Sequence, residues 1–361
     1  MKSVKELINP AILSMQAYHV PTSTGLMKLD AMENPYDWPE EVQRKWLHEL
    51  KDIHINRYPD AASSILKDKL RAAMGIPDNL SIMLGNGSDE LIQIIAMALA
   101  GSDRTFLAPE PGFVMYRLIS RTVNTAYIAV QLNPDDFSLD RNVMLTAIKE
   151  HQPELIFIAY PNNPTGNLFD RDTVLEVIKH APGLVVIDEA YHAFARTSFM
   201  EYLNEFDNLL VMRTLSKSGL AGLRLGYLLG KSNWIDELEK IRLPYNINCL
   251  SQKTAVFILS HDEILTGQAE NICRDREVLF QHLSKTENIK VWPSAANFIL
   301  FRMVGLDANR VFDGLKEHGI LIKNLNGSHP LLQNCLRVTV GTTQEITAFI
   351  EALRQVIKNY H

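Results

Sequence analysis

The chain reads Arg213-Thr-Leu-Ser-Lys-Ser-Gly-Leu-Ala-Gly-Leu-Arg-Leu-Gly-Tyr227 between two short runs that resemble β-strands, Leu209–Met212 and Leu225–Leu229. Lys217 lies in this loop among small and apolar residues, with Arg213 and Arg224 on either side. Burial and neighbouring cations both disfavour an ammonium ion, so a lysine here can act as a neutral amine toward an aldehyde. The arginines can then bind an anionic group of the same ligand. The alternative is an ordinary loop with a solvated lysine.

These two runs belong to a series of short β-rich runs that alternate with helical segments. This alternation is typical of an α/β protein with a mostly parallel sheet that is covered on both faces. The predicted strands of this seven-stranded sheet are Ser81–Leu84, Thr105–Ala108, Ala126–Gln131, Leu155–Tyr160, Leu184–Ile187, Leu209–Met212 and Leu225–Leu229. A helical region around Trp234–Arg242 and a long helix over Lys253–Leu283 follow, and the runs Phe298–Arg302 and Leu336–Val340 predict a smaller α+β domain.

Changes in texture along the chain suggest four regions. Residues 1–35 have weak periodicity and are expected to form an N-terminal arm. Residues 36–80 contain two amphipathic helices, which we expect to belong to the small domain and to an interface. Residues 81–245 form the large domain, and residues 246–361 contain an interdomain helix and the rest of the small domain.

The composition limits the classes of function. The 361 residues include 46% hydrophobic and 22% charged residues, enough to build a large core. A net charge of -6 without basic runs argues against nucleic acid or an anionic membrane as the main partner. Three well-separated cysteines suggest neither disulfides nor a cysteine-rich zinc site. With no signal-peptide pattern or membrane-spanning run, we expect a cytoplasmic protein.

A second candidate binding element is Gly85-Asn-Gly-Ser-Asp-Glu90, which follows a predicted strand and begins an apolar helix. Glycines allow a close turn, and the free N–H groups of a helix N-terminus can bind phosphate. The segment is neither a Walker A loop nor a dinucleotide fingerprint, since the lysine-serine ending and the third glycine are missing. The alternative is a simple helix cap by Ser88.

Polar residues also follow two apolar strands, in Tyr160-Pro-Asn-Asn-Pro-Thr-Gly-Asn167 and Val185-Val-Ile-Asp-Glu-Ala-Tyr191. Ligands of open α/β sheets bind at the carboxyl ends of strands, so Asn163, Asp188 and Tyr191 are expected to meet in one crevice. Asp188 ends a strand expected to be buried, where a carboxylate needs a partner to stay ionised. A protonated ring nitrogen of a cofactor is such a partner.

Together these elements specify an amine nucleophile, an anion clamp and a carboxylate for a cationic ring. Pyridoxal 5'-phosphate needs all three, for its aldehyde, its phosphate and its pyridinium nitrogen. We therefore predict that this cofactor binds with Lys217 at its aldehyde.

The ordered motifs Gly85–Glu90, Asn162–Gly166, Asp188–Tyr191, Ser216-Lys217 and Gly222–Arg224 resemble those of the fold type I pyridoxal-phosphate-dependent aminotransferases, and the resemblance covers Tyr18 to Thr342. It implies that Lys217 binds the cofactor aldehyde and moves the proton, that Asp188 pairs with the ring nitrogen, and that Tyr191 and Asn163 bond the ring hydroxyl. It further implies phosphate contacts from Ser88, Asp89, Ser216 and Arg224, and ring stacking by Tyr116. Without the resemblance, Tyr116 is equally well explained as a core aromatic.

The same resemblance implies a homodimer, because Arg57-Tyr58-Pro59 is similar to a segment that reaches the partner's cofactor phosphate. Arg337 is similar to the arginine that binds the substrate's anionic group, although a strand arginine paired with a surface acid is the simpler interpretation. Tyr18, Tyr58 and Asn163 would add hydrogen bonds to substrate. Lys323 stands where many relatives have arginine, and as a point charge it lacks the bidentate fork.

Within the family the chain most resembles the members that transaminate histidinol phosphate with 2-oxoglutarate to imidazole acetol phosphate and glutamate, a step of histidine biosynthesis. The alternatives are an aromatic amino acid aminotransferase, a threonine-phosphate decarboxylase of the same fold, and a cofactor-binding regulator. A regulator would be supported by a basic DNA-binding module, but the chain has no such module. His54, His151, His180 and His192 have no metal-binding spacing, so we expect no metal.

Overall fold

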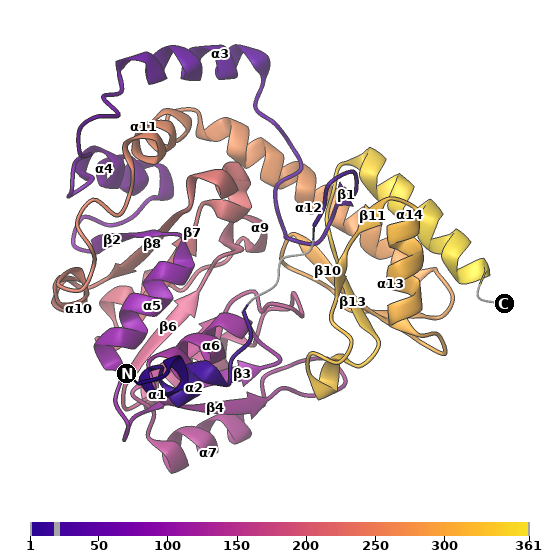
Figure 1. Ribbon diagram of the computed structural model, residues 1–361, viewed down its shortest axis with the longest axis horizontal. Helices are drawn as coiled ribbons and strands as arrows, with labels where there is room; N and C mark the ends of the chain where they lie inside the picture. Colours follow the sequence, from indigo (N-terminus) through magenta and orange to yellow (C-terminus); the bar gives the residue numbers. More distant parts are fainter. Residues whose placement is uncertain (1, 18–21, 360–361) are drawn as a thin grey trace.

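A computed structural model describes residues 2–17 and 22–359, in which the long helix α12 (Asp262–Ser284) joins a large and a small domain (Figure 1). Within these residues the large domain is built on a seven-stranded sheet of strand order β2-β8-β7-β6-β5-β3-β4. Its strands are β2 (Ser81–Asn86), β3 (Thr105–Glu110), β4 (Ala126–Gln131), β5 (Leu155–Ala159), β6 (Leu184–Asp188), β7 (Leu209–Thr214) and β8 (Leu225–Gly230). The predicted fold class and strands are confirmed, and each strand end lies within about two residues of its predicted place.

Helices cover both faces of this sheet. One face packs against α4 (Ser64–Met74), α7 (Arg141–His151), α8 (Arg171–His180) and α11 (Cys249–Ile258), and the other against α5 (Ser88–Leu99), α6 (Val114–Thr122) and α10 (Ser232–Glu239). Every residue of β5, β6 and β7 is buried. Burial from both sides explains why these strands are nearly continuous apolar runs rather than alternating ones.

The strand directions bring several loops to one edge of the sheet. Strands β3 to β7 are parallel, whereas β8 is antiparallel to both of its neighbours, β7 and β2. The loop from β7 to β8 therefore lies where the parallel strands end, and so does the turn from β2 to α5. Ligands of open α/β sheets bind at this edge.

The small domain contains a four-stranded antiparallel sheet of order β12-β13-β10-β9 and a parallel pair of β1 and β11. Its elements are β1 (Met27–Lys28), β9 (Ile289–Val291), β10 (Phe298–Met303), α13 (Ala308–Glu317), β11 (Ile320–Leu321), β12 (Lys323–Asn324), β13 (Cys335–Thr339) and α14 (Thr343–Lys358). Its core also includes Tyr191 and Phe194, around the short helix α9 (His192–Ala195). The small domain is thus packed directly on a segment of the predicted site.

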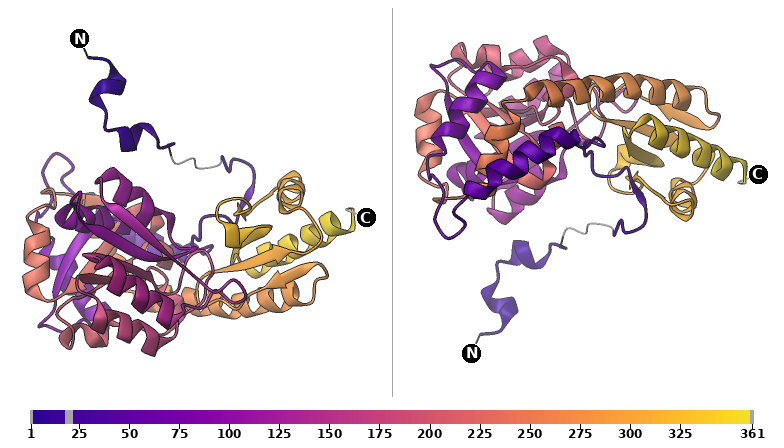
Figure 2. Two further views of the ribbon diagram at one scale, coloured as in Figure 1. Left: turned by 90° about the horizontal axis from the view of Figure 1, so that it is seen from below. Right: turned by 90° about the horizontal axis from the view of Figure 1, so that it is seen from above.

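The N-terminal regions differ from the predicted division. Helices α3 (Glu40–Glu49) and α4 pack on α11, and Leu66 and Leu70 of α4 join the large core, so residues 36–80 do not belong to the small domain. The part of the N-terminal region that does belong there is β1, because it pairs with β11. Further upstream, α1 (Val4–Leu7) and α2 (Pro10–Leu13) project from the large domain (Figure 2).

The predicted helix over 253–283 is two helices. The chain leaves helical geometry at His261, whose φ is -132° and ψ 43°, and α12 begins at Asp262 with two acidic residues in its first turn. Carboxylates there favour a new helix N-terminus. None of the helices in the described ranges has the length and apolarity needed to cross a membrane.

Candidate active site

A cavity with an empty volume of about 540 Å³ lies at the carboxyl ends of the parallel strands. It is lined by Met32, Ser88, Asp89, Phe113, Ala159, Pro161, Asn163, Asp188, Ala190, Tyr191, Thr214, Ser216, Lys217 and Arg224. Eight of the predicted cofactor residues, Asn163 among them, therefore meet here, although they come from segments far apart in the sequence.

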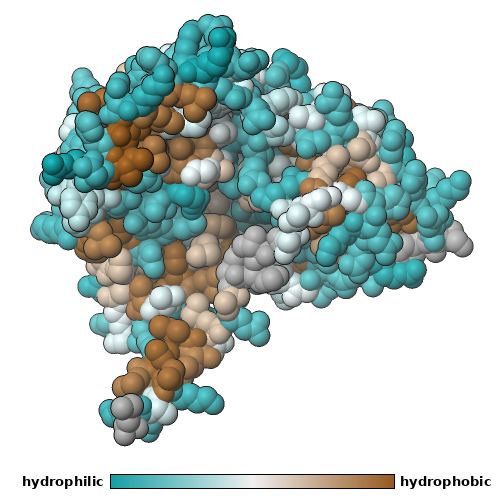
Figure 3. Space-filling model, turned by 45° about the horizontal axis from the view of Figure 1, so that its top comes forward, coloured by the Kyte–Doolittle hydropathy of each residue, from teal (hydrophilic) through white to brown (hydrophobic). Residues whose placement is uncertain are grey.

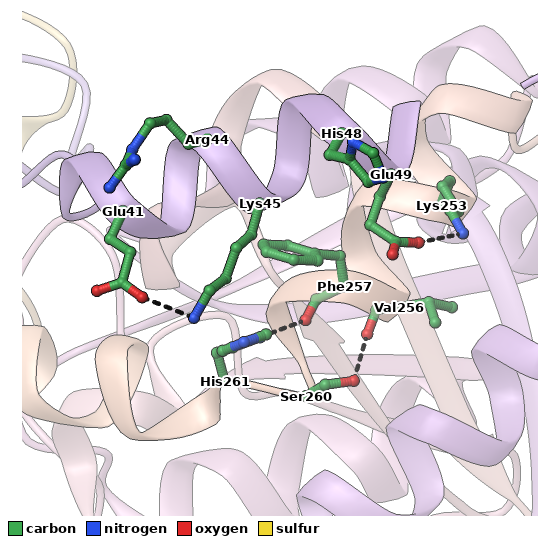
Figure 4. A pocket seen from close by; sticks show the side chains of 10 residues that line it. All are labelled: Glu41, Arg44, Lys45, His48, Glu49, Lys253, Val256, Phe257, Ser260 and His261. Carbon is green, nitrogen blue, oxygen red and sulfur yellow. Dashed lines mark hydrogen bonds and ion pairs between the residues drawn. The ribbon is translucent and has the colours of Figure 1, made fainter. Parts of the chain in front are cut away.

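A larger groove of about 1230 Å³ lies between α3 and α11, but it contains none of the predicted site residues (Figure 4). Both lysines that line it are paired with glutamates of the same groove, Lys45 with Glu41 and Lys253 with Glu49. We therefore place the chemistry in the smaller cavity at the sheet edge.

Lys217 lies in a single π-helical turn, Ser216–Leu220, between β7 and β8. Gly219 breaks this turn with a φ of 109°, a conformation that residues with a side chain rarely adopt. The Nζ atom of Lys217 donates a hydrogen bond to the main-chain oxygen of Ala31 at 3.0 Å. Burial lowers the pKa of Lys217 to about 8, with a further contribution from Arg337. The share of neutral amine, the nucleophilic form, is therefore much larger near neutral pH than for an ordinary lysine, although the ammonium form still predominates at about pH 7.

Asp188 is the last residue of β6, and only 4% of it is exposed. Its Oδ2 accepts a hydrogen bond from the Tyr116 hydroxyl at 2.7 Å, and its Oδ1 accepts one from the Ala190 N–H at 3.0 Å. Burial raises the pKa of Asp188 to about 6, although these two hydrogen bonds act in the opposite direction. A cation beside this carboxyl group would favour its ionised form.

Asn163 connects two other predicted site residues. Its Nδ2 donates to the Tyr191 hydroxyl at 3.1 Å, while its Oδ1 accepts from Nη1 of Arg337 at 2.5 Å. Arg337 also donates from Nη2 to the main-chain oxygen of Asp30 at 3.0 Å and stacks over the Phe298 ring. A ligand bonded to Tyr191 or Asn163 is therefore linked to the buried guanidinium of the small domain.

The residues predicted to bind phosphate form one cluster at the start of α5. Arg224 donates from Nη1 to the Ser216 hydroxyl at 3.3 Å, and its Nη2 lies 3.5 Å from Oδ2 of Asp89. A Cβ atom added to Gly87 would lie 2.5 Å from Arg224 Nη2. The glycine thus leaves room for the guanidinium beside the free N–H groups of the helix, a combination that suits an anion.

The structure does not place Tyr116 where we predicted it. Its ring packs against Phe157, with centroids 4.6 Å apart, and its hydroxyl donates a hydrogen bond to Oδ2 of Asp188. The described lining of the cavity contains Phe113 instead, so the stacking role expected of Tyr116 does not fit this position. The sequence held a usable signal, because Phe113 lies in the short loop between β3 and α6, whereas Tyr116 is already inside α6.

The remaining predicted substrate residues lie outside this lining. Lys323 is on β12 directly opposite Arg337 on β13, at the small-domain side. Tyr58 is 81% exposed and stacks on Tyr245 at 4.4 Å. Tyr18 lies outside the described residues.

Arg213, one of the two arginines beside Lys217 that we considered for anion binding, forms a buried ion pair with Glu189 at 2.9 Å. Its Nη2 also donates to the Ser198 hydroxyl at 2.8 Å. The charge of Arg213 is therefore neutralised beneath the site, and the guanidinium available to an anion in the lysine loop is that of Arg224.

Comparisons with known proteins agree with this geometry. Residues 24–353 match the family Aminotransferase class I and II. The chain therefore belongs to the class I and II aminotransferases. Among its relatives, histidinol-phosphate aminotransferase 2 of Nitrosococcus oceani is 51% identical over 99% of both chains, and the histidinol-phosphate aminotransferase of Chromobacterium violaceum is 48% identical over 98% of both.

Solved structures agree at the level of the fold. The histidinol-phosphate aminotransferase of Sinorhizobium meliloti, solved with pyridoxal-5'-phosphate, has a TM-score of 0.86 at 24% identity and covers 98% of both chains. The L-threonine-O-3-phosphate decarboxylase of Porphyromonas gingivalis has a TM-score of 0.77 at 22% identity, covering 92% of this chain and 100% of its own.

Proposed function

We propose that this protein transfers the amino group of histidinol phosphate to 2-oxoglutarate, giving imidazole acetol phosphate and glutamate, a step of histidine biosynthesis. The observation that supports it most strongly is the meeting of Lys217, Asp188 and the Arg224 cluster in one cavity of an aminotransferase. Full-length relatives that are histidinol-phosphate aminotransferases support the choice of substrate.

The residues of the cavity fit pyridoxal 5'-phosphate. Burial raises the pKa of the Asp188 carboxyl group, and a cationic ring nitrogen beside it would supply the charge that keeps it ionised. The cluster of Ser88, Asp89, Ser216 and Arg224 matches a phosphate, with the N–H groups of the first two as donors. When bound, this cofactor supplies an aldehyde for the amino group and an electron-withdrawing ring next to the reacting carbon.

Each side chain then has a distinct task. Lys217 would hold the cofactor through its amine, and as a free amine it would carry the proton removed from the substrate carbon. Asp188 stays ionised beside the ring nitrogen, while Tyr191 and Asn163 hold the ring hydroxyl. Phe113, rather than Tyr116, packs against the ring face.

The substrate end of the site must accept two different anions. Histidinol phosphate has a phosphate and no α-carboxylate, whereas 2-oxoglutarate has two carboxylates. Arg337 and Lys323, directly opposite each other on adjacent strands, provide two cations at one end of the site. Tyr18 and Asn163 add hydrogen-bond donors. Because a lysine is a point charge, Lys323 allows both anions with less geometric selectivity than an arginine.

We further infer that the enzyme is a cytoplasmic homodimer in which Tyr58 reaches the partner's cofactor phosphate. Stacking of Tyr58 on Tyr245 brings together two segments whose apolar residues Ile55 and Leu243 are 77% and 71% exposed. Figure 3 shows further apolar surface on α1 and α2. Exposed apolar residues grouped in this way favour contact with a second copy.

The test is a panel of amino donors with 2-oxoglutarate as acceptor, using the purified holoenzyme. We expect kcat/KM for histidinol phosphate to exceed the values for phenylalanine and tyrosine by at least about 100-fold, because the aromatic amino acids lack the phosphate. A preference for phenylalanine or tyrosine would indicate an aromatic aminotransferase, and release of CO2 from threonine phosphate a decarboxylase. Lys217→Ala should abolish turnover with every donor.

A further inference from the structure

The segment Leu29–Tyr36, which we call the strap, runs from the small domain to the lysine loop. On the small-domain side, the Leu29 N–H donates to the Leu321 oxygen at 2.8 Å, and the Leu29 oxygen accepts from the Thr339 N–H at 2.9 Å. The Met32 N–H donates to the Thr339 hydroxyl, and the Met32 oxygen accepts from Asn297 Nδ2, both at 3.0 Å. The first half of the strap is therefore fixed to the small domain.

The second half of the strap is fixed to the lysine loop and to α12. Asn34 Nδ2 donates to Gln268 Oε1 on α12 at 2.9 Å and lies 3.4 Å from the Ser218 oxygen. Gln268, only 8% exposed, donates in turn to the Asp37 oxygen at 3.0 Å. Asn34 Oδ1 accepts from the Tyr36 N–H at 2.9 Å. Both ends of the Asn34 amide are thus used, within a partly buried hydrogen-bond network.

Asn34 also interlocks with the glycine that shapes the lysine loop. A Cβ atom on Gly219 would lie 2.9 Å from Asn34 Nδ2, closer than side chains pack. The amide therefore occupies the space that the missing side chain leaves, immediately after Lys217 and Ser218. Between the two fixed ends, the Ala31 oxygen accepts the hydrogen bond from Lys217 Nζ.

We propose that Asn34 is a positioning residue that holds the strap against the lysine loop, so that the Ala31 carbonyl fixes the Lys217 amine and the strap excludes water from it. The proposal rests on the proposed function only in taking Lys217 as the reacting amine. Asn34 is not among the described residues that line the cavity, so it acts through Lys217 rather than on the ligand.

Loss of the strap contact has a defined consequence for the lysine. The lowered pKa of Lys217 comes mainly from its burial, to which the strap contributes through Ala31 and Met32. Arg337 and Arg224 lower the pKa further, whereas Glu33 of the strap and Asp89 raise it. Burial is the largest of these effects, so its loss outweighs the loss of the Glu33 charge when the strap moves away. If the strap separates from the loop, water reaches Nζ, and the ammonium ion is better solvated. The pKa should then rise toward its ordinary value.

The experiment uses the ligand-free full chain and measures the pH dependence of Lys217 acetylation by a brief pulse of amine reagent, with mass spectrometry as readout. The midpoint of this profile reports the pKa and does not depend on how accessible the amine is. We expect Asn34→Ala and Gln268→Ala each to raise the midpoint by about one pH unit, and the double variant to raise it no further.

The matched control is Gln43→Ala. Gln43 is an exposed amide whose hydrogen bond, at 2.7 Å, goes to the Trp38 oxygen of its own segment rather than to the strap or the lysine loop, so its removal should leave the midpoint unchanged. In the holoenzyme, Asn34→Ala should lower kcat with KM for histidinol phosphate within about twofold, since Asn34 touches no substrate.

A midpoint in Asn34→Ala equal to that of wild type would overturn the proposal, and if this variant does not fold, Gln268→Ala decides in the same way. If the wild type is active with histidinol phosphate but the midpoint of Asn34→Ala equals that of wild type, the role of Asn34 is rejected and the proposed function stands. A shifted midpoint in a chain without histidinol-phosphate activity rejects the proposed function and leaves the role of Asn34 intact.

Discussion

At the scale of the residue, the ionised carboxyl group of Asp188 lowers the folding stability of the ligand-free protein. Its pKa of about 6 lies above the ordinary value of 3.8, so folding favours the protonated acid. The group therefore imposes no penalty below about pH 4, and the penalty grows as the pH rises and is complete above about pH 6. Under the proposed function, this loss of folding stability is offset when a cationic cofactor ring binds beside the carboxylate.

We predict that Asp188→Asn stabilises the ligand-free protein at about pH 8 and has little effect at about pH 4. The asparagine oxygen still accepts from the Ala190 N–H, and its NH2 group can donate to the Tyr116 hydroxyl. The gain should reach at most about 3 kcal/mol, since each pKa unit corresponds to about 1.4 kcal/mol. Urea unfolding at both pH values measures it, and an equal gain at both would contradict the pKa argument. Turnover of the holoenzyme should fall at least about 100-fold, because the ring nitrogen loses its counter-charge.

At the scale of the element, the turn from β2 into α5 is where the proposed function puts the cofactor phosphate. Gly87, with a φ of 84°, leaves the space that Arg224 occupies. We predict that Gly87→Ala weakens binding of pyridoxal phosphate at least about tenfold, because the new methyl group displaces the guanidinium from the helix N-terminus. Fluorescence titration of the ligand-free chain with the cofactor measures this affinity.

Gly75→Ala is the matched control for this variant. Gly75 ends α4 with a φ of 61°, and a Cβ there would meet no heavy atom within 4 Å. It should cost about 1 kcal/mol of stability through backbone strain and leave cofactor affinity unchanged. Equal affinities of the two variants would show that the space beside Arg224 is irrelevant.

The elements also show what the sequence can and cannot predict. The strands β5, β6 and β7 were predictable because burial on both faces requires uninterrupted apolar runs, and Lys217, Asp188 and Arg224 because their charges are unusual beside such strands. The error at Tyr116 arose from the start of α6, which turns that ring into the core and leaves Phe113 at the cavity. The bond from Lys217 to Ala31 had no signal at all, since every residue has a carbonyl oxygen.

At the scale of the whole molecule, the proposed dimer can be tested by complementation. Lys217→Ala and Tyr58→Ala should each have little activity, the second because the partner's phosphate loses a hydrogen bond. In a mixed dimer, the site with an intact Lys217 receives an intact Tyr58 from the other subunit. Unfolding and refolding an equal mixture should therefore restore about a quarter of wild-type activity, since about half of the dimers are mixed and each has one complete site.

The control for this experiment is refolding of each variant alone, which should restore nothing. Recovery in the mixture at the level of the separate variants would mean that Tyr58 does not act across an interface. Because the readout is relative activity, it is independent of the identity of the best amino donor.

The pairing of β1 with β11 has a consequence for how the chain folds during synthesis. Met27 is synthesised before the strands of the large domain, whereas its strand partner Ile320 is synthesised after all of them. The large domain, whose strands all lie between these two points, can fold first, as domains generally do during translation. The strap joins the small domain only afterwards, so the last contacts to form are those that close the catalytic centre around Lys217. A ribosome-bound chain therefore contains a folded sheet before it contains an enzyme.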